Sequence, residues 1–218
     1  MPDAPLTFGF DPPAALFDLA AELRQVIDKM LVIDDPGDEV GAARTEVAAI
    51  AARLERIGRR GHKARLHPSI PPGPDDDRPY YAANARRWHC NPLFPPITFD
   101  TAARGLRGRL QLGITHEGPP GCVHGGVVAL LLDQFLGQSN VEAGVPAMTG
   151  SLTVRFRRPT PLWREIIVEA DGPERADDRR CLTRGRITCD GEITAEAQGL
   201  FVLPRGIDLP VSTGGAES

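Results

Sequence analysis

Cysteine is scarce in this sequence, and the few cysteines that it has form no pattern. The four residues, Cys90, Cys122, Cys181 and Cys189, include no C-x-x-C pair and no tight cluster with histidine. Zinc sites and disulfide frameworks both depend on such spacings. We therefore interpret the cysteines as reduced thiols and expect no metal site.

The sequence also lacks a strong net charge and any long apolar run. A net charge of -4 over 218 residues gives no general attraction to nucleic acid or to an anionic membrane. The first residues, MPDAPLTFGFDPP, lack the basic start and the apolar run of a signal peptide, and no run approaches the length of a membrane span. We expect a soluble, cytoplasmic protein with no nucleic-acid or membrane partner.

The N-terminal part of the sequence has helical periodicity. Apolar residues recur every three or four positions from 12 to 33, after a DPP start, and again from 38 to 57. The two segments predict a helical hairpin whose apolar stripes pack on each other or on the main domain, or form a short coiled-coil seam. Several prolines and an acidic run from 67 to 79 indicate a linker. We expect three parts: the hairpin and linker at 1–80, the main domain at 81–205, and a flexible tail at 206–218.

After residue 80 the pattern changes from helical to alternating. Five segments have the alternation of strands: 106–114, 150–159, 165–172, 180–191 and 192–203. Turn signals at Gly172-Pro173 and Asp190-Gly191 join the last three into an antiparallel meander. One helix interrupts the strands, from about Gly125 to Gly137. This order predicts an α+β fold in which one long helix packs on an antiparallel sheet.

An aspartate interrupts the apolar run of this helix, in GCVHGGVVALLLDQFLGQ at 121–138. A helical projection places Asp133 on one narrow sector with Gly126 and Gly137, with Gln134 at its flank. The opposite side, which must cover the sheet, carries Val128, Leu131, Leu132 and Phe135. Asp133 therefore faces either water or a cleft at a subunit interface, where the two glycines would let another backbone come close.

The helix begins at His124-Gly125-Gly126, where backbone N–H groups have no helical partners. Such an end can hold an oxyanion, and Gly125 and Gly126 would let a ligand approach the backbone closely. Alternatively, the glycines only allow a tight turn. Gly125 and Asp133 are about 12 Å apart along the helix axis, whereas a catalytic base must lie about 3 Å from the water that it activates. A catalytic interpretation therefore requires two antiparallel copies, in a homodimer.

Three motifs resemble those of one enzyme family. The runs PPGCVHGGVVALLLD, MTGSLTVRFRRPTPL at 148–162 and DGEITAEAQGLFV at 190–202 are similar to the hotdog-fold acyl-CoA thioesterases of the PaaI-like branch, over roughly residues 85–205. The resemblance implies an antiparallel sheet wrapped around one long helix, paired into dimers with active sites at the interface. It also implies hydrolysis of acyl-CoA to free acid and coenzyme A, without a cofactor, by a homodimer or a dimer of dimers.

The resemblance assigns roles residue by residue. Gly125 corresponds to the residue whose N–H polarises the thioester carbonyl, with His124 beside it. Asp133 matches the carboxylate, supplied by the partner chain, that activates water or attacks directly. Thr149 falls where related enzymes place a hydroxyl that orients this carboxylate or the water. The chain departs from some relatives at Gly118, where they carry a polar amide, so any help from that side chain is missing.

Coenzyme A carries phosphates, so cations are expected near the mouth of its pocket. The candidates are Arg155, Arg157 and Arg158 in VRFRRP, and the first two would point together because alternate residues of a strand share a face. They either bind those phosphates or form an exposed strand face. Cys122 is better interpreted as a small apolar filler than as a nucleophile paired with His124.

Two other functions fit the same fold class. An acyl-CoA-binding module without turnover would not need a carboxylate beside a thioester, so Asp133 argues against it. A hotdog dehydratase would pair its acid with a histidine in a different motif, which this sequence lacks. Hydrolysis of acyl-CoA is therefore the favoured function.

Overall fold

The computed structural model describes residues 14–35, 37–58, 90–95, 97–100, 105–145 and 147–203 of the 218-residue chain. The chain divides into two compact units, residues 1–90 and residues 91–218. The predicted linker at 67–79, the domain boundary near 80 and the tail from 206 lie outside the described residues, so the predicted domain limits stay predictions. Within the described residues, no helix combines the length and the hydrophobicity that spanning a membrane requires.

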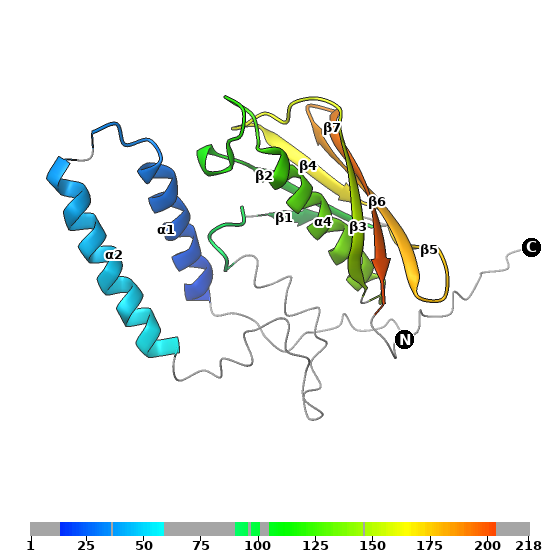
Figure 1. The fold of residues 1–218 in the computed structure, drawn as a ribbon, viewed down its shortest axis with the longest axis horizontal. Helices are drawn as coiled ribbons and strands as arrows, with labels where there is room; N and C mark the ends of the chain where they lie inside the picture. Colours follow the sequence, from blue (N-terminus) through cyan, green and yellow to red (C-terminus); the bar gives the residue numbers. More distant parts are fainter. Residues whose placement is uncertain are drawn as a thin grey trace, which may run out of the picture. The chain divides into compact units, whose positions relative to one another are not determined.

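The first unit contains the two predicted helices, α1 (Ala14–Met30) and α2 (Gly37–Gly58). They run antiparallel and are joined by a short turn (Figure 1). Asp38 and Glu39 in the first turn of α2 and Arg56 in its last turn complement the helix dipole. The apolar stripe of α2 is between 37% and 46% exposed, at Val40, Val47, Ile50 and Leu54. Both predicted helices are confirmed, but the contacts among the described residues bury the apolar stripe of α2 only in part.

The second unit is an antiparallel sheet with one long helix against one face (Figure 1). The sheet order is β1-β2-β4-β6-β7-β3, with β5 paired to β6. The strands are β1 (Thr98–Asp100), β2 (Leu106–Gln111), β3 (Met148–Phe156), β4 (Glu165–Ala170), β5 (Glu174–Arg175), β6 (Arg180–Cys189) and β7 (Glu192–Val202), and a 3-10 turn, η2 (Ile114–His116), follows β2. The five predicted strands and the β4-β6-β7 meander are confirmed. The sequence does not predict β1 and β5, which are too short to show an alternating pattern.

The long helix, α4 (Gly125–Glu142), ends later than the sequence predicts. Gly137 lies inside it, and the chain leaves the helix only at Gly144, whose φ of 75° suits a glycine after a helix end. Two polar residues hold the extra turn in place. The Ser139 hydroxyl donates to the carbonyl of Asp171 (2.8 Å), and Asn140 accepts from the hydroxyl of Thr183. The predicted end at Gly137 is wrong because these tertiary hydrogen bonds outweigh the weak helix propensity of glycine.

The core lies between α4 and the inner face of the sheet. The helix contributes side chains that are at most 2% exposed, Val128, Leu131, Leu132, Phe135 and Leu136. Opposite them, burial alternates along β4 and β6, so one face of each strand is apolar. Two glycines let the helix come close: a Cβ at Gly108 would lie 2.7 Å from the ring of Phe135, and one at Gly185 would lie 3.3 Å from Leu136. This packing fixes where the start and the middle of α4 stand relative to the sheet.

Candidate active site

One backbone N–H is left free at the start of α4. His124 caps the helix, and its ring nitrogen Nδ1 accepts a hydrogen bond from the Gly126 N–H (2.9 Å). The His124 carbonyl accepts from the N–H groups of Val127 (2.9 Å) and Val128 (3.1 Å). Of the four N–H groups that open a helix, that of Gly125 alone has no hydrogen-bond partner within the described residues. The free group belongs to the residue that the resemblance pairs with the thioester carbonyl.

The loop before α4 is held tightly against His124. The Cys122 N–H donates to the carbonyl of Pro119 (2.8 Å), the Gly118 N–H to that of Cys122 (2.9 Å), and the His124 N–H to that of His116 (2.9 Å). A Cβ at Gly118 would lie 2.6 Å from Cα of His124. This position therefore has no room for the amide side chain that some relatives carry, and the tight loop fixes the orientation of the helix start.

Asp133 lies on the less buried side of α4 and is itself partly buried. Its Oδ1 accepts a hydrogen bond from the Thr149 hydroxyl (2.9 Å), while its Oδ2 has no partner among the described residues. The neighbouring Leu130 is 39% exposed, and Leu131 and Leu132 on the other side are buried, as the helical projection predicts. The carboxylate is thus neither a core charge nor fully solvated: one oxygen is held, and the other is open to a donor.

A bulge in β3 brings Thr149 to the side of the sheet that faces α4. The paired residues of β3 run from Thr149 directly to Ser151, so Gly150 forms the bulge. Strict alternation would place Thr149 on the same face as Arg155. The bulge reverses the faces, and the hydroxyl therefore reaches Asp133. A glycine inside a strand is the sequence signal for such a bulge.

Within one chain, the two groups of the predicted site stay apart. Gly125 is the first residue of α4, and Asp133 stands eight residues later on the same helix, about 12 Å along its axis. A single thioester cannot place its carbonyl oxygen against the Gly125 N–H and its attacking water against the Asp133 carboxylate when the two groups are so far apart. The single chain therefore brings Asp133 to Thr149 and not to the free N–H of Gly125.

Phe156 is a neighbour of the helix start that the sequence reasoning missed. It is the last residue of β3 and is 58% exposed. Its ring lies 3.5 Å from the place where a Cβ on Gly125 would stand, so the ring occupies the side toward which a side chain at Gly125 would point. The signal for it was available, because Phe156 alternates with Leu152 and Val154, which pack against the core. An exposed aromatic ring thus lies beside Gly125.

Two of the three predicted arginines lie on the outer face of the sheet. Arg155 and Arg157 alternate with the core-facing residues of β3, so they project from the outer face of the sheet, away from α4. Arg157 donates from Nε to Glu196 (2.6 Å), and Arg158 forms an ion pair with Glu192 (2.6 Å). Arg155 has no hydrogen-bond or ion-pair partner among the described residues. Arg155 and Arg157 thus lie on the opposite face of the sheet from α4, which carries Gly125, Gly126 and Asp133.

No family model matches the chain. A comparison with curated proteins finds relatives that are named acyl-coenzyme A thioesterases. The chain is 32% identical over 106 residues to acyl-coenzyme A thioesterase THEM4 of Xenopus laevis, covering 48% of this chain and 47% of that protein. It is 32% identical over 94 residues to THEM4 of Mus musculus, covering 42% of this chain and 40% of that protein. The chain thus spans about half the length, or less, of these curated relatives.

One solved structure matches this chain over nearly the whole length of the solved chain. The crystal structure of a thioesterase superfamily protein is 30% identical to this chain, with a TM-score of 0.69, and the match covers 88% of this chain and 97% of that one. Residues 81–205 are 125 of the 218, so this match extends beyond the predicted main domain. The predicted hotdog fold is confirmed, and the chain belongs to the thioesterase superfamily, as its sequence motifs predict.

Proposed function

We propose that the protein hydrolyses acyl-CoA thioesters to a free acid and coenzyme A, as a homodimer and without a cofactor. Membership of the thioesterase superfamily and the names of the curated relatives support the reaction class. The observation that carries the proposal is the hydrogen bond from Thr149 to Asp133, because it holds one carboxylate oxygen and leaves the other available. The proposal includes a cytoplasmic setting, which suits free thiols.

The helix start stabilises the negative charge that develops on the thioester oxygen. In this mechanism the carbonyl oxygen accepts a hydrogen bond from the free N–H of Gly125, at the positive end of the α4 dipole. Stabilisation by one such donor is worth about 3 kcal/mol in the transition state. Gly126 has no side chain to block the approach, and the His124 ring stays in place because its Nδ1 accepts the Gly126 N–H. In this mechanism the Phe156 ring, which lies beside Gly125, contacts the acyl group next to the carbonyl.

The partner chain supplies the base. Asp133 of the partner subunit takes a proton from a water molecule, and the water oxygen attacks the thioester carbon to form a tetrahedral intermediate. The intermediate collapses, the carbon–sulfur bond breaks, and the CoA thiolate leaves. The thiolate takes the proton back from the Asp133 carboxyl, which restores the carboxylate. Thr149 donates to one oxygen of Asp133 throughout, so the other oxygen faces the water.

The homodimer follows from the separation along α4, because no single chain joins Gly125 to Asp133. Two antiparallel copies place the carboxylate of each chain opposite the helix start of the other. β3, which carries Thr149, is at the end of the sheet order and is exposed along most of its length. An edge strand of this kind can pair with a second copy of itself.

The direct test is the release of coenzyme A from acyl-CoA esters of increasing chain length and from one aromatic ester. We expect saturable hydrolysis, and Thr149→Ala should lower kcat roughly tenfold with little change in KM, because it removes one hydrogen bond to a charged group. Ser151→Ala is the matched control, since this hydroxyl is on the same strand beyond the bulge. Tight binding of acyl-CoA esters without turnover would overturn the proposal in favour of a binding module.

A further inference from the structure

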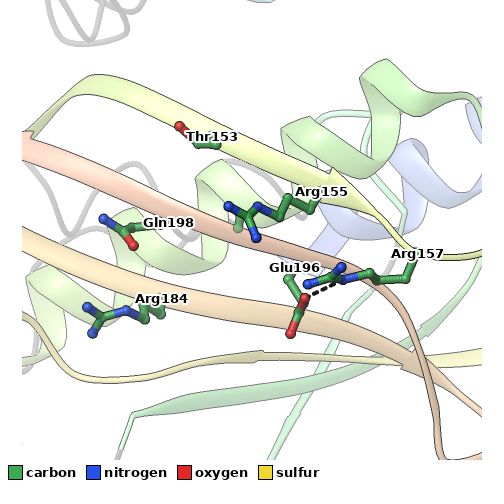
Figure 2. A pocket seen from close by; sticks show the side chains of 7 residues that line it. Thr153, Arg155, Arg157, Arg184, Glu196 and Gln198 are labelled. Carbon is green, nitrogen blue, oxygen red and sulfur yellow. Dashed lines mark hydrogen bonds and ion pairs between the residues drawn. The ribbon is translucent and has the colours of Figure 1, made fainter.

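The outer face of the sheet holds a polar groove, on the side away from α4. Figure 2 shows the side chains that line it, on β3, β7 and β6 and at Arg157 just after β3, and the groove has a volume of about 510 Å³. Its lining is Thr153, Arg155, Arg157, Arg184, Glu196, Ala197 and Gln198. The lining contains three guanidinium groups and one carboxylate, so it carries a net charge of about +2 at neutral pH.

The single carboxylate in the groove is already engaged. Glu196 stands directly across from Arg155 in the β3–β7 ladder, yet its Oε2 accepts from Arg157 (2.6 Å) instead. Its other cross-strand neighbour, Arg186, donates to Glu169 (2.8 Å). Arg155 is therefore left without an ion-pair partner among the described residues, with its guanidinium in the groove (Figure 2).

The two ion pairs around the groove are weak restraints. The side chains of Arg157 and Glu196 are 50% and 38% exposed, and those of Arg184 and Glu174, which pair at 2.6 Å, are 47% and 63% exposed. Exposed pairs of this kind contribute about 0–1 kcal/mol. A ligand with concentrated negative charge can therefore engage these guanidinium groups at little cost, in addition to the free one of Arg155.

We infer that this groove binds a ligand carrying two or more adjacent phosphate groups. Guanidinium groups bind phosphate through paired, charge-assisted hydrogen bonds, and three of them can engage more than one phosphate. Thr153 and Gln198, which face each other across β3 and β7, add neutral donors. The lining has no aromatic or large aliphatic side chain, so an acyl chain or a base would find little apolar contact there. The volume is within the range of small-molecule sites.

This binding does not depend on the proposed hydrolysis, because the groove and the candidate active site lie on opposite faces of the sheet. The phosphates have two possible sources, the nucleotide end of coenzyme A itself or a separate phosphorylated compound. Both share the chemistry that the groove recognises, and competition between them separates the two.

The experiment is calorimetric titration of the whole 218-residue chain with pyrophosphate at low ionic strength. We expect saturable binding that weakens as salt is added, since exposed charges are screened. Arg155→Gln should weaken it about tenfold, the size of one charge-assisted hydrogen bond. Glu196→Gln should strengthen it several-fold, because it removes the only negative charge of the lining and frees Arg157. The control is Arg164→Gln, which changes another exposed arginine, one that pairs with Asp190 outside the groove.

Opposite effects of Arg155→Gln and Glu196→Gln distinguish binding from a general disturbance of the sheet. Absence of saturable pyrophosphate binding, equal losses in Arg155→Gln and Arg164→Gln, or losses in both groove variants would overturn the inference. If coenzyme A competes with pyrophosphate, the groove accepts the phosphates of coenzyme A; if both bind together, the groove holds a separate phosphorylated ligand. Asp133→Asn should strongly reduce hydrolysis but leave pyrophosphate binding unchanged. Failure of the proposed hydrolysis and failure of phosphate binding in the groove can therefore be told apart.

Discussion

The two faces of the β-sheet use the same strands for different chemistry. The inner face is apolar and covered by α4, with Val168 and Ile187 fully buried. The outer face has a row of alternating charges across β3, β7, β6 and β4, formed by Arg155, Glu196, Arg186 and Glu169. β3 serves both faces, since Thr149 reaches Asp133 on the helix side while Arg155 lines the outer groove. Because alternate residues of a strand point to opposite faces, the position of a residue along the strand decides which of the two sites it can join. One bulge is enough to move a residue to the other face.

Removing the charge of Asp133 should have the largest effect if the chemistry belongs to the helix side. Asp133→Asn keeps the size of the side chain, and its amide oxygen can still accept from Thr149. It cannot take a proton from water, so kcat should fall by about 100-fold or more, as expected for a positioned base. Because Asp133 is only partly buried, the melting temperature should stay within about 2 °C of the wild type. Steady-state kinetics and a thermal melt measure both.

The control for that variant is Glu142→Gln, which neutralises another carboxylate of α4. Glu142 is exposed at the end of the helix and accepts only a long hydrogen bond from Gln138 (3.3 Å). Its loss should leave kcat unchanged. Wild-type turnover in Asp133→Asn, or a fall of the same size in Glu142→Gln, would show that the carboxylate does no chemistry.

Mixing two inactive chains tests whether each site takes one residue from each subunit. Gly125→Pro removes the free N–H, and the fold should accept it because Gly125 is the first helical residue and His124 before it is extended, with ψ of 133°. Combined with Asp133→Ala in random dimers, it should restore about a quarter of the wild-type activity, because half of the dimers are mixed and each mixed dimer has one intact site. Activity is measured after refolding the chains together.

Either parent alone should stay inactive in that experiment. Mixed dimers that fold, as shown by tagged copurification, but recover no activity would place both groups in one chain. The antiparallel arrangement would then be wrong, whatever the value for Asp133→Asn.

Much of this arrangement is readable from the sequence, and the exceptions have physical reasons. The alternation of 180–191 predicts β6, and the projection of α4 places Asp133 opposite Leu131 and Leu132, because local periodicity is enough for both. The end of α4 is misplaced because buried hydrogen bonds of Ser139 and Asn140 come from residues distant in sequence. The reach of Thr149 depends on a bulge whose exact register strand pairing sets.

Arg155 and Phe156 show the same limit at the site itself. Their alternation in VRFRRP is visible in the sequence, but which of the two faces the helix depends on the pairing of β3 with β7. The sequence therefore predicts the arginines near the substrate pocket and does not single out the ring beside Gly125. The sequence shows which residues of the strand share a face, whereas the tertiary fold decides which of the two faces meets the helix.

A pair of neighbouring substitutions in β6 sharpens the contrast between the faces. Gly185→Ala points toward α4, where the added Cβ would lie 2.6 Å from the backbone oxygen of Glu169. The strand backbone cannot move away easily, so we expect a loss of about 1–3 kcal/mol in the free energy of unfolding, larger than the gain of about 0.5–1 kcal/mol from replacing a strand glycine. Arg184→Ala, on the outer face, should cost at most about 1 kcal/mol, because it removes one exposed ion pair. Urea unfolding of both variants measures the difference, and equal losses would contradict the contrast.

The cysteines give the smallest expected signal, a difference in labelling rate. Cys181 and Cys189 on the inner face of β6 are 1% and 5% exposed, and burial raises the pKa of both thiols, helped at Cys189 by its hydrogen bond to Asp190. A raised pKa leaves less thiolate at a given pH, so both should react with a thiol reagent at pH 8 more slowly than a free cysteine. Cys122, partly exposed in the loop before α4, should react before either of them. Mass spectrometry of labelled peptides, with Cys122→Ser as control, follows each site. Fast labelling of Cys181 in the folded protein would mean that the inner face opens without unfolding, and the close packing of α4 on the sheet would not hold in solution.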